Sequence, residues 1–113
     1  MNDDAVPSVD VGRAATLLRA DAVLLDVREP EEFVAGRAEN AVAIPIGELA
    51  LRTGELSKDD TIILVCRTGS RSALATVALN AAGFHAFNLE GGMVAWQDAN
   101  LPVVSDAGPG IVI

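Results

Sequence analysis

The chain has one cysteine and one histidine among its 113 residues, and these shortages exclude several kinds of site. A single cysteine, Cys66, excludes an intramolecular disulfide and any cysteine pair that would act in redox chemistry or bind zinc. With only one histidine as well, no group of residues has the spacing of metal ligands. We therefore expect neither a metal nor another cofactor.

Positive charge and long apolar segments are also scarce. The formal net charge of −8 argues against nucleic acid or an anionic membrane as a partner. No apolar run approaches the roughly 18–20 residues that cross a bilayer. Residues 1–4 have neither the positive nor the apolar region of a signal peptide. We therefore expect a cytoplasmic protein.

Acidic residues are missing from one long segment of this acidic chain. No aspartate or glutamate occurs between Asp60 and Glu90. The segment contains Cys66 together with Arg67 and Arg71. An acidic protein that keeps negative charge away from its only thiol points to that thiol as the first candidate for a functional site.

What the chain does contain is an alternation of short apolar runs with helical stretches. Half of the residues are hydrophobic, which is enough for one domain of this length to bury a core. The alternation is typical of βαβ units in a parallel sheet. We place a single domain at residues 6–103, with residues 1–5 and 104–113 as loosely held termini.

The predicted strands are near-continuous apolar runs, as in strands that are buried on both faces. They cover residues 23–27, 41–44, 61–65 and 85–89, with a short edge strand at 6–9. The predicted helices have readable ends. They run from a cap at Asp10 to about Arg19, from Pro30 to Gly36, and over 47–52, 71–82 and 93–99.

Two of these helices carry further expectations. In the helix that begins at Pro30, the acidic side chains of Glu31 and Glu32 complement the helix dipole. In the helix over 71–82, apolar residues recur at helical spacing and predict the buried face. Its predicted members are Leu74, Val77, Ala78 and Ala81.

The segment most suited to chemistry joins the strand at 61–65 to the helix that starts near Arg71. In open α/β sheets, ligands bind beyond the carboxyl ends of the strands, where this loop must lie. The loop consists of Cys66, Arg67, Thr68, Gly69 and Ser70. Unpaired backbone amides and the positive end of the helix should face it, and Gly69 lets the chain close around it. We expect these donors to lower the pKa of Cys66.

A thiolate inside an anion cradle needs a substrate that is anionic and that accepts attack by sulfur. Thiosulfate meets both conditions, because attack on its outer sulfur releases sulfite and leaves a persulfide on Cys66. The persulfide is itself an anion, so the same donors would stabilise it. This displacement needs no general base once the thiolate exists. Ser70 and Ser72 either line the cradle or cap the helix, and the two roles are compatible.

Several stretches, in order and at the right spacing, resemble the rhodanese family. The first half of the family pattern is matched by Leu24-Leu25-Asp26-Val27-Arg28-Glu29, Glu31-Glu32-Phe33, Gly36, Ala41 and Ile44-Pro45. The active-site loop is matched by Cys66-Arg67-Thr68-Gly69-Ser70-Arg71-Ser72, and the ending by Leu89-Glu90-Gly91-Gly92, Ala95-Trp96 and Leu101-Pro102. The resemblance covers about residues 8–103.

This resemblance implies an α/β fold with a five-stranded, mainly parallel sheet of order 1-5-4-2-3 and helices on both faces. It also implies a sulfurtransferase with Cys66 as the catalytic nucleophile and residues 67–72 as the binding loop. Loop length favours sulfur over phosphate. Related phosphatases have Cys-x5-Arg, whereas this chain has Cys-x4-Arg, and the next position is Ser72.

The chain departs from the family at residues 36–41, where Gly-Arg-Ala-Glu-Asn-Ala replaces the common Gly-His-Ile-Pro-Gly-Ala. The roles of Arg37 and Asn40 there stay open. Near the strand ends, Asp26 and Arg28 are either an acid–base pair or structural support. We favour support, with Asp26 accepting hydrogen bonds from backbone or an arginine.

The leading hypothesis is that the protein moves sulfur from a small anionic donor to cyanide or a thiol. The acceptor, a small thiol or a protein, must come from outside, because the chain has no second cysteine. Two alternatives remain. One is a non-enzymatic sulfur carrier or regulatory module that docks to a partner, and the other is a phosphatase or arsenate reductase. Arg67 and Arg71 are either binding residues or solvated surface charges.

Overall fold

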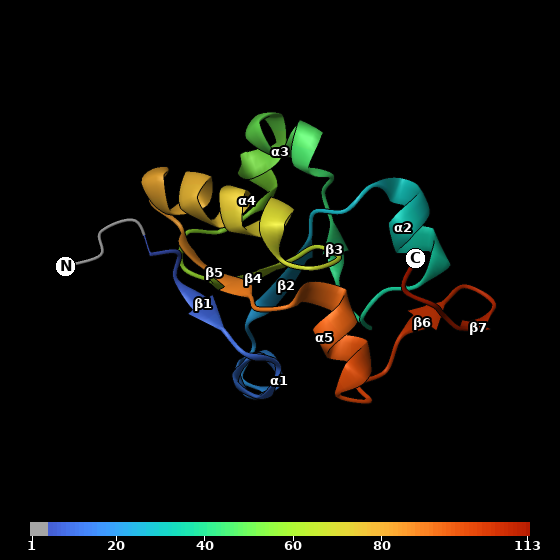
Figure 1. The fold of residues 1–113 in the computed structure, drawn as a ribbon. Coiled ribbons are helices and arrows are strands. Elements are labelled where there is room, and N and C mark those ends of the chain that lie inside the picture. Colours follow the sequence, from blue (N-terminus) through green and yellow to red (C-terminus); the bar gives the residue numbers. More distant parts are fainter. Residues whose placement is uncertain (1–4) are drawn as a thin grey trace.

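A computed structural model describes residues 5–113, and it contains the predicted alternation of strands and helices (Figure 1). The strands of the main sheet are β1 (Ser8–Val9), β2 (Val23–Asp26), β3 (Val42–Ala43), β4 (Thr61–Val65) and β5 (His85–Leu89). The helices are α1 (Val11–Arg19), α2 (Pro30–Ala35), α3 (Ile46–Arg52), α4 (Ser70–Ala81) and α5 (Gly92–Asp98). A short 3-10 turn, Thr53–Glu55, follows α3.

The five strands form one parallel sheet in the order β1-β5-β4-β2-β3, which confirms the predicted fold class. The strand with the most continuous apolar run, β4, occupies the centre. It pairs with β2, placing Leu64 beside Leu25, and with β5, placing Ile63 beside Phe87. A central parallel strand is covered on both faces, which explains why β4 shows no alternation of polar and apolar residues.

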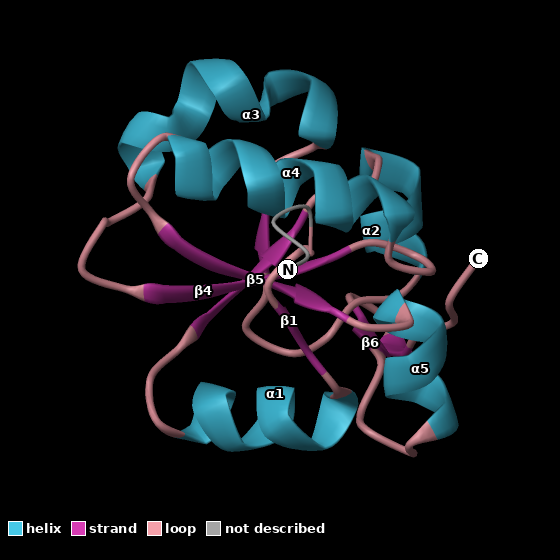
Figure 2. Ribbon diagram, turned by 60° about the vertical axis from the view of Figure 1, so that its left-hand side comes forward, coloured by secondary structure: helices cyan, strands magenta, loops and turns pink. Residues whose placement is uncertain are grey.

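The helices cover the two faces of the sheet, with α3 and α4 on one face and α1 and α5 on the other (Figure 2). Side chains of β4 alternate between them. Ile62 and Leu64 join the core beneath α3 and α4, whereas Ile63 and Val65 join the core beneath α1 and α5. Cys66 continues the alternation and belongs to the α3 and α4 side. The direction of the thiol is thus set by the pleat of the central strand.

The predicted buried face of α4 is wrong. Leu74, Val77, Ala78 and Ala81 are all exposed, Leu74 to 71%. The buried residues are Ser72, Ala75, Thr76 and Leu79. Apolar spacing misses this face because two of its members are polar.

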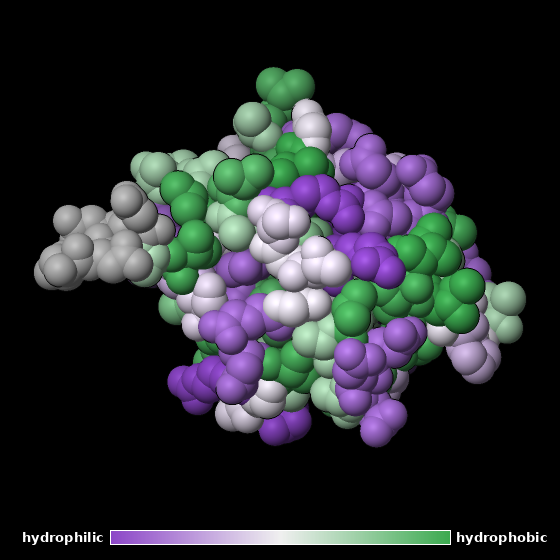
Figure 3. All heavy atoms as spheres, viewed as in Figure 1, coloured by the Kyte–Doolittle hydropathy of each residue, from purple (hydrophilic) through white to green (hydrophobic). Residues whose placement is uncertain are grey.

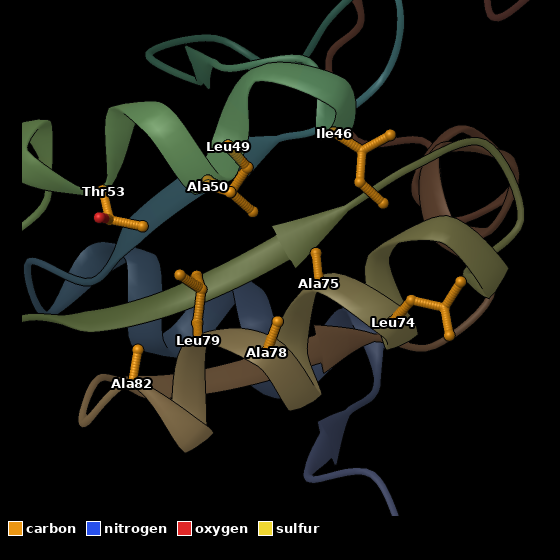
Figure 4. A pocket seen from close by; sticks show the side chains of 9 residues that line it. All are labelled: Ile46, Leu49, Ala50, Thr53, Leu74, Ala75, Ala78, Leu79 and Ala82. Carbon is orange, nitrogen blue, oxygen red and sulfur yellow. The ribbon is translucent and has the colours of Figure 1, made fainter.

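Hydrogen bonds inside α4 and to the sheet make this polar face possible. The Thr76 hydroxyl donates to the Ser72 carbonyl at 2.8 Å, and the Ser72 hydroxyl is bonded at the site described below. Leu74 and Ala78 instead line a groove of about 450 Å³ between α3 and α4, opposite residues such as Leu49 (Figure 4). No residue of the groove belongs to the loop at residues 66–70.

The C-terminal segment, which we expected to be loosely held, forms a hairpin of β6 (Val104–Ser105) and β7 (Gly108–Pro109). Arg37 and Val104 exchange backbone hydrogen bonds of 2.9 and 2.8 Å, and the Ile111 amide donates to the Ala35 carbonyl at 3.0 Å. The hairpin therefore lies beside α2 (Figure 1). Residues 1–4 of the other expected loose terminus lie outside the described residues.

The hairpin contacts also give a structural role to the departure from the family pattern at residues 36–41. The Arg37 side chain pairs with Asp106 of the hairpin and stacks over the Phe33 ring, 5.0 Å from its centroid. Asn40 has a φ of +66°, a left-handed conformation that asparagine tolerates better than most residues.

Within residues 5–113, no helix has both the length and the apolar character needed to cross a membrane.

Candidate active site

Cys66 follows β4 directly, and its side chain is almost completely buried, with 1% of the residue exposed. Its Sγ atom accepts hydrogen bonds from the backbone amides of Gly69 and Ser72, at 3.1 and 3.4 Å. The Ser72 hydroxyl lies 3.3 Å from the same sulfur. The loop therefore folds around the thiol and turns its donors inward, as the sequence predicts.

The shape of this loop depends on the start of α5. The amides of Met93 and Val94 donate to the carbonyls of Cys66 and Arg67, at 2.8 and 3.1 Å. These bonds hold the loop carbonyls toward α5. At Gly92 the backbone approaches so closely that a Cβ atom would lie 2.5 Å from both carbonyl oxygens, and its φ is +60°. Gly69, with a φ of +109°, precedes α4 and completes the turn.

The environment of Cys66 favours the thiolate overall. Burial disfavours the charged sulfur, but the Ser72 hydroxyl and the backbone amides of Ser72, Gly69 and Thr68 outweigh burial and lower the pKa of Cys66. The direction agrees with the sequence-based expectation. The donors differ in part from those expected. A hydroxyl and backbone amides lower the pKa of Cys66, and neither Arg67 nor Arg71 bonds to the sulfur.

Asn88, which sequence reasoning did not select, lies against the loop from β5. Its Oδ1 atom accepts from the Ser72 hydroxyl at 2.6 Å, and its Nδ2 atom donates to the Gly69 carbonyl at 3.2 Å. One amide thus bridges Gly69 and Ser72 of the turn that encloses Cys66. The signal available in the sequence was a single asparagine among apolar residues near the carboxyl end of a predicted strand.

Arg71 forms an ion pair with an acidic residue, although the sequence segment around Cys66 contains no aspartate or glutamate. Its guanidinium forms two hydrogen bonds with the Glu32 carboxylate of α2, at 2.6 and 2.9 Å. Hydrogen bonding to Arg71 lowers the pKa of Glu32 to about 2, and the same bond raises the pKa of Arg71. The fold brings Glu32 to the loop from far away in the sequence, so the local charge pattern could not show it.

The remaining loop side chains are exposed, and none of them hydrogen-bonds to the sulfur. Arg67 is exposed, and its Nε atom donates to the carbonyl of Ile113 at 3.1 Å. Thr68 and Ser70 are exposed at the loop surface. In the space-filling view, mostly pale and purple residues surround this part of the surface, next to a green apolar area around the C-terminal end of the chain (Figure 3). Val34 of α2 and Ile111 and Ile113 of the C-terminal segment are exposed apolar residues.

Asp26 and Arg28 form a buried ion pair at the carboxyl end of β2. The Asp26 carboxylate accepts from Nε and Nη2 of Arg28, and Nη2 also donates to the Gly36 carbonyl at 2.7 Å. The pair thus links the end of β2 to the end of α2, which is the geometry expected of a supporting role.

His85 lies at the opposite end of β5 from Asn88. Among residues 5–113, no three His, Cys, Asp or Glu side chains gather as metal ligands would.

Comparison with known proteins shows which domain family this chain resembles. The family pattern of the rhodanese-like domain matches residues 10–99. A sulfurtransferase of Allochromatium vinosum is 35% identical over 89 residues, which cover 78% of this chain and 83% of that protein. Thiosulfate sulfurtransferase 18 of Arabidopsis thaliana is 35% identical, and the match covers 88% of this chain and 85% of that protein.

A solved structure shows the same similarity in three dimensions. The crystal structure of a rhodanese-related protein from Thermoplasma volcanium superposes with a TM-score of 0.82 at 34% sequence identity. The match covers 87% of this chain and 97% of the other. The fold, the cysteine loop and these relatives together show that this chain belongs to the rhodanese-like domain family.

Proposed function

We propose that the protein is a sulfurtransferase that carries sulfur from thiosulfate, or a similar anionic donor, to a thiophilic acceptor through a persulfide on Cys66. One observation carries the proposal: the only thiol of the chain is buried in a turn of inward-facing hydrogen-bond donors that favour its thiolate. The relationship to proteins named sulfurtransferase agrees with this chemistry.

The loading step needs only the thiolate and the donor. The Cys66 sulfur forms a bond to the outer sulfur of thiosulfate, the sulfur–sulfur bond of the donor breaks, and sulfite leaves with the bonding electron pair. The negative charge of Cys66 then resides on the outer sulfur of the persulfide. No proton moves, and no oxidant or reductant is needed. A step without proton transfer suits a site in which the sulfur's hydrogen-bond partners, among residues 5–113, are backbone amides and a hydroxyl.

The unloading step needs an external acceptor. Cyanide attacks the outer sulfur, leaves as thiocyanate and restores the thiolate, and a thiol or a protein would serve in the same way. No second cysteine exists in the chain to receive the sulfur internally. A free thiol that must stay reduced suits the reducing cytoplasm, which is where we place the activity.

Steady-state turnover of thiosulfate and cyanide tests the proposal. We expect the protein to form thiocyanate and Cys66→Ser to reduce the rate to that of a protein-free control, because a serine hydroxyl does not become a comparable nucleophile. Ser57→Ala, at a residue that precedes β4 whereas Cys66 follows it, provides a control that should retain the rate. Undiminished turnover by Cys66→Ser would refute the mechanism. Absence of turnover with thiosulfate and other sulfane-sulfur donors would favour a carrier role instead.

A further inference from the structure

The Ser72 hydroxyl has one proton and two acceptors within reach. Its Oγ atom lies 3.3 Å from Cys66 Sγ and 2.6 Å from Asn88 Oδ1. Ser72 and Asn88 are 0% and 7% exposed, so their polar atoms depend on one another rather than on bulk water. Because the hydroxyl carries a single proton, it donates to only one of the two acceptors at a time.

The orientation of Asn88 follows from its second contact. The Gly69 carbonyl only accepts, so the Asn88 atom that lies 3.2 Å from it must be the amide nitrogen. Oδ1 then faces Ser72. An amide oxygen carries no proton, so the 2.6 Å contact requires the proton of the Ser72 hydroxyl. In that arrangement Ser72 turns a lone pair toward Cys66 Sγ, which suits a protonated thiol as donor.

Ionisation of Cys66 reverses this requirement. A thiolate accepts hydrogen bonds, so the Ser72 hydroxyl stabilises it only by turning from Asn88 to Sγ. The turn leaves the Asn88 oxygen without a donor in a buried position, which is unfavourable. The backbone amides of Gly69 and Ser72 do not face this conflict, because among the described residues Cys66 Sγ is the one acceptor seen for each of them.

We propose that Asn88 is a positioning residue that competes with the Cys66 thiolate for the Ser72 hydroxyl proton and thereby sets how readily Cys66 ionises. The consequence for turnover rests on the proposed function. When a persulfide forms, the negative charge moves to the outer sulfur, and the hydroxyl returns to Asn88. In the thiolate state the Ser72 hydroxyl donates to Cys66 Sγ, and in the persulfide state it donates to Asn88. Asn88 therefore favours the persulfide over the free thiolate.

The rate of Cys66 alkylation by iodoacetamide as a function of pH tests the proposal. The chain has one cysteine, so the reaction reports on Cys66 alone, and it needs no sulfur donor. A protein that transfers no sulfur would still give a clear answer. Asn88→Leu keeps the size of the side chain but removes the acceptor. We expect the midpoint of its pH profile to fall, with severalfold faster alkylation below the wild-type midpoint. Ser72→Ala removes the donor, and its midpoint should rise.

The double variant distinguishes positioning from general damage to the loop. If Asn88 acts through the Ser72 hydroxyl, Ser72→Ala combined with Asn88→Leu should have the midpoint of Ser72→Ala alone. Asn80→Leu is the matched control. Asn80 also bonds to backbone, with contacts of 2.9 and 2.8 Å to Ala86, but it does not touch the loop, so its loss should leave the midpoint unchanged.

Circular dichroism establishes that each variant is folded before its profile is compared. If Asn88→Leu does not fold, Asn88→Ala replaces it with the same expectation, because alanine also lacks the acceptor. A midpoint that stays or rises when Asn88 is replaced in a folded protein would overturn the proposal. An equal fall in the Ser72→Ala background would also overturn it, because Asn88 would then act without the hydroxyl.

Discussion

Cys66 is buried by the core yet surrounded by donors, and its reactivity depends on the balance between the two. Burial alone would keep the thiol protonated, whereas the Ser72 hydroxyl and three backbone amides lower its pKa. The sequence predicted this residue and its direction of shift from its place between a buried strand and a helix. Asn88 and Glu32 could not be assigned in the same way, because their contacts with the loop depend on the three-dimensional packing of β5 and α2.

The ion pair between Glu32 and Arg71 predicts a pH-dependent contribution to stability. The pKa of Glu32 is lowered from 4.5 to about 2 in the folded protein. Its contribution is therefore complete above pH 4.5 and is lost as the pH falls from 4.5 toward 2. We expect Glu32→Gln to lower the free energy of unfolding by about 1 kcal/mol at pH 7, since the pair is partly solvated. Below the pKa of Glu32 this difference should vanish.

Urea denaturation at several pH values measures this effect. Glu31→Gln is the control, because Glu31 lies on the same helix but is exposed and makes no ion pair among the described residues. Its stability difference should be small at every pH. A Glu32→Gln difference that persists unchanged at low pH would show that the carboxylate does not act through its charge.

Among the elements, α5 contacts the Cys66 loop directly, although it lies far from Cys66 in the sequence. Its first amides fix the carbonyls of Cys66 and Arg67, and Gly92 allows the two backbones to meet. The family resemblance includes Gly91 and Gly92 but does not identify their contact partner. The partner is another loop at the same edge of the sheet, and only the strand order β5-β4 brings the two together.

Gly92→Ala should therefore damage the site through the backbone. The added Cβ would lie 2.5 Å from two carbonyl oxygens at a φ of +60°. We expect a loss of at least about 2 kcal/mol in unfolding free energy, from strain and overlap together. Thermal denaturation measures the loss, and iodoacetamide reactivity at fixed pH reports whether the donors around Cys66 have moved.

Gly47→Ala provides the matched control in α3, where a Cβ would meet nothing within 4 Å. Alanine is the better helix former, so this variant should be neutral or more stable by about 0.4–1 kcal/mol. Equal stability of the Gly92→Ala and Gly47→Ala variants would contradict the role given to the contact between α5 and the loop.

The misassigned face of α4 shows where apolar periodicity fails. The spacing of Leu74, Val77, Ala78 and Ala81 describes an apolar stripe, but that stripe is exposed, and part of it borders the groove with α3. The sheet-facing residues include Ser72 and Thr76, whose hydroxyls find partners within the helix and on β5. A polar site built into the core reverses the usual relation between hydropathy and burial.

At the scale of the whole molecule, the order of strands was implied by the family resemblance, and the position of the C-terminal segment was not. The segment was expected to be loosely held as a chain terminus. It is ordered by backbone bonds to Arg37 and Ala35, at the edge of the molecule that also carries the loop. The unusual arginine at position 37 and the apolar tail thus belong to one packing arrangement.

The single cysteine makes the central claim open to a direct test on the intact protein. If Cys66 accepts sulfur from thiosulfate, all added mass must reside on that residue, because no other thiol is present. Intact-protein mass spectrometry after brief exposure to thiosulfate and removal of excess donor gives the answer. The wild-type protein should gain the mass of one sulfur atom and lose it on addition of cyanide, whereas Cys66→Ser should gain nothing. Failure of the wild-type protein to gain a sulfur, or an equal gain by Cys66→Ser, would contradict the account.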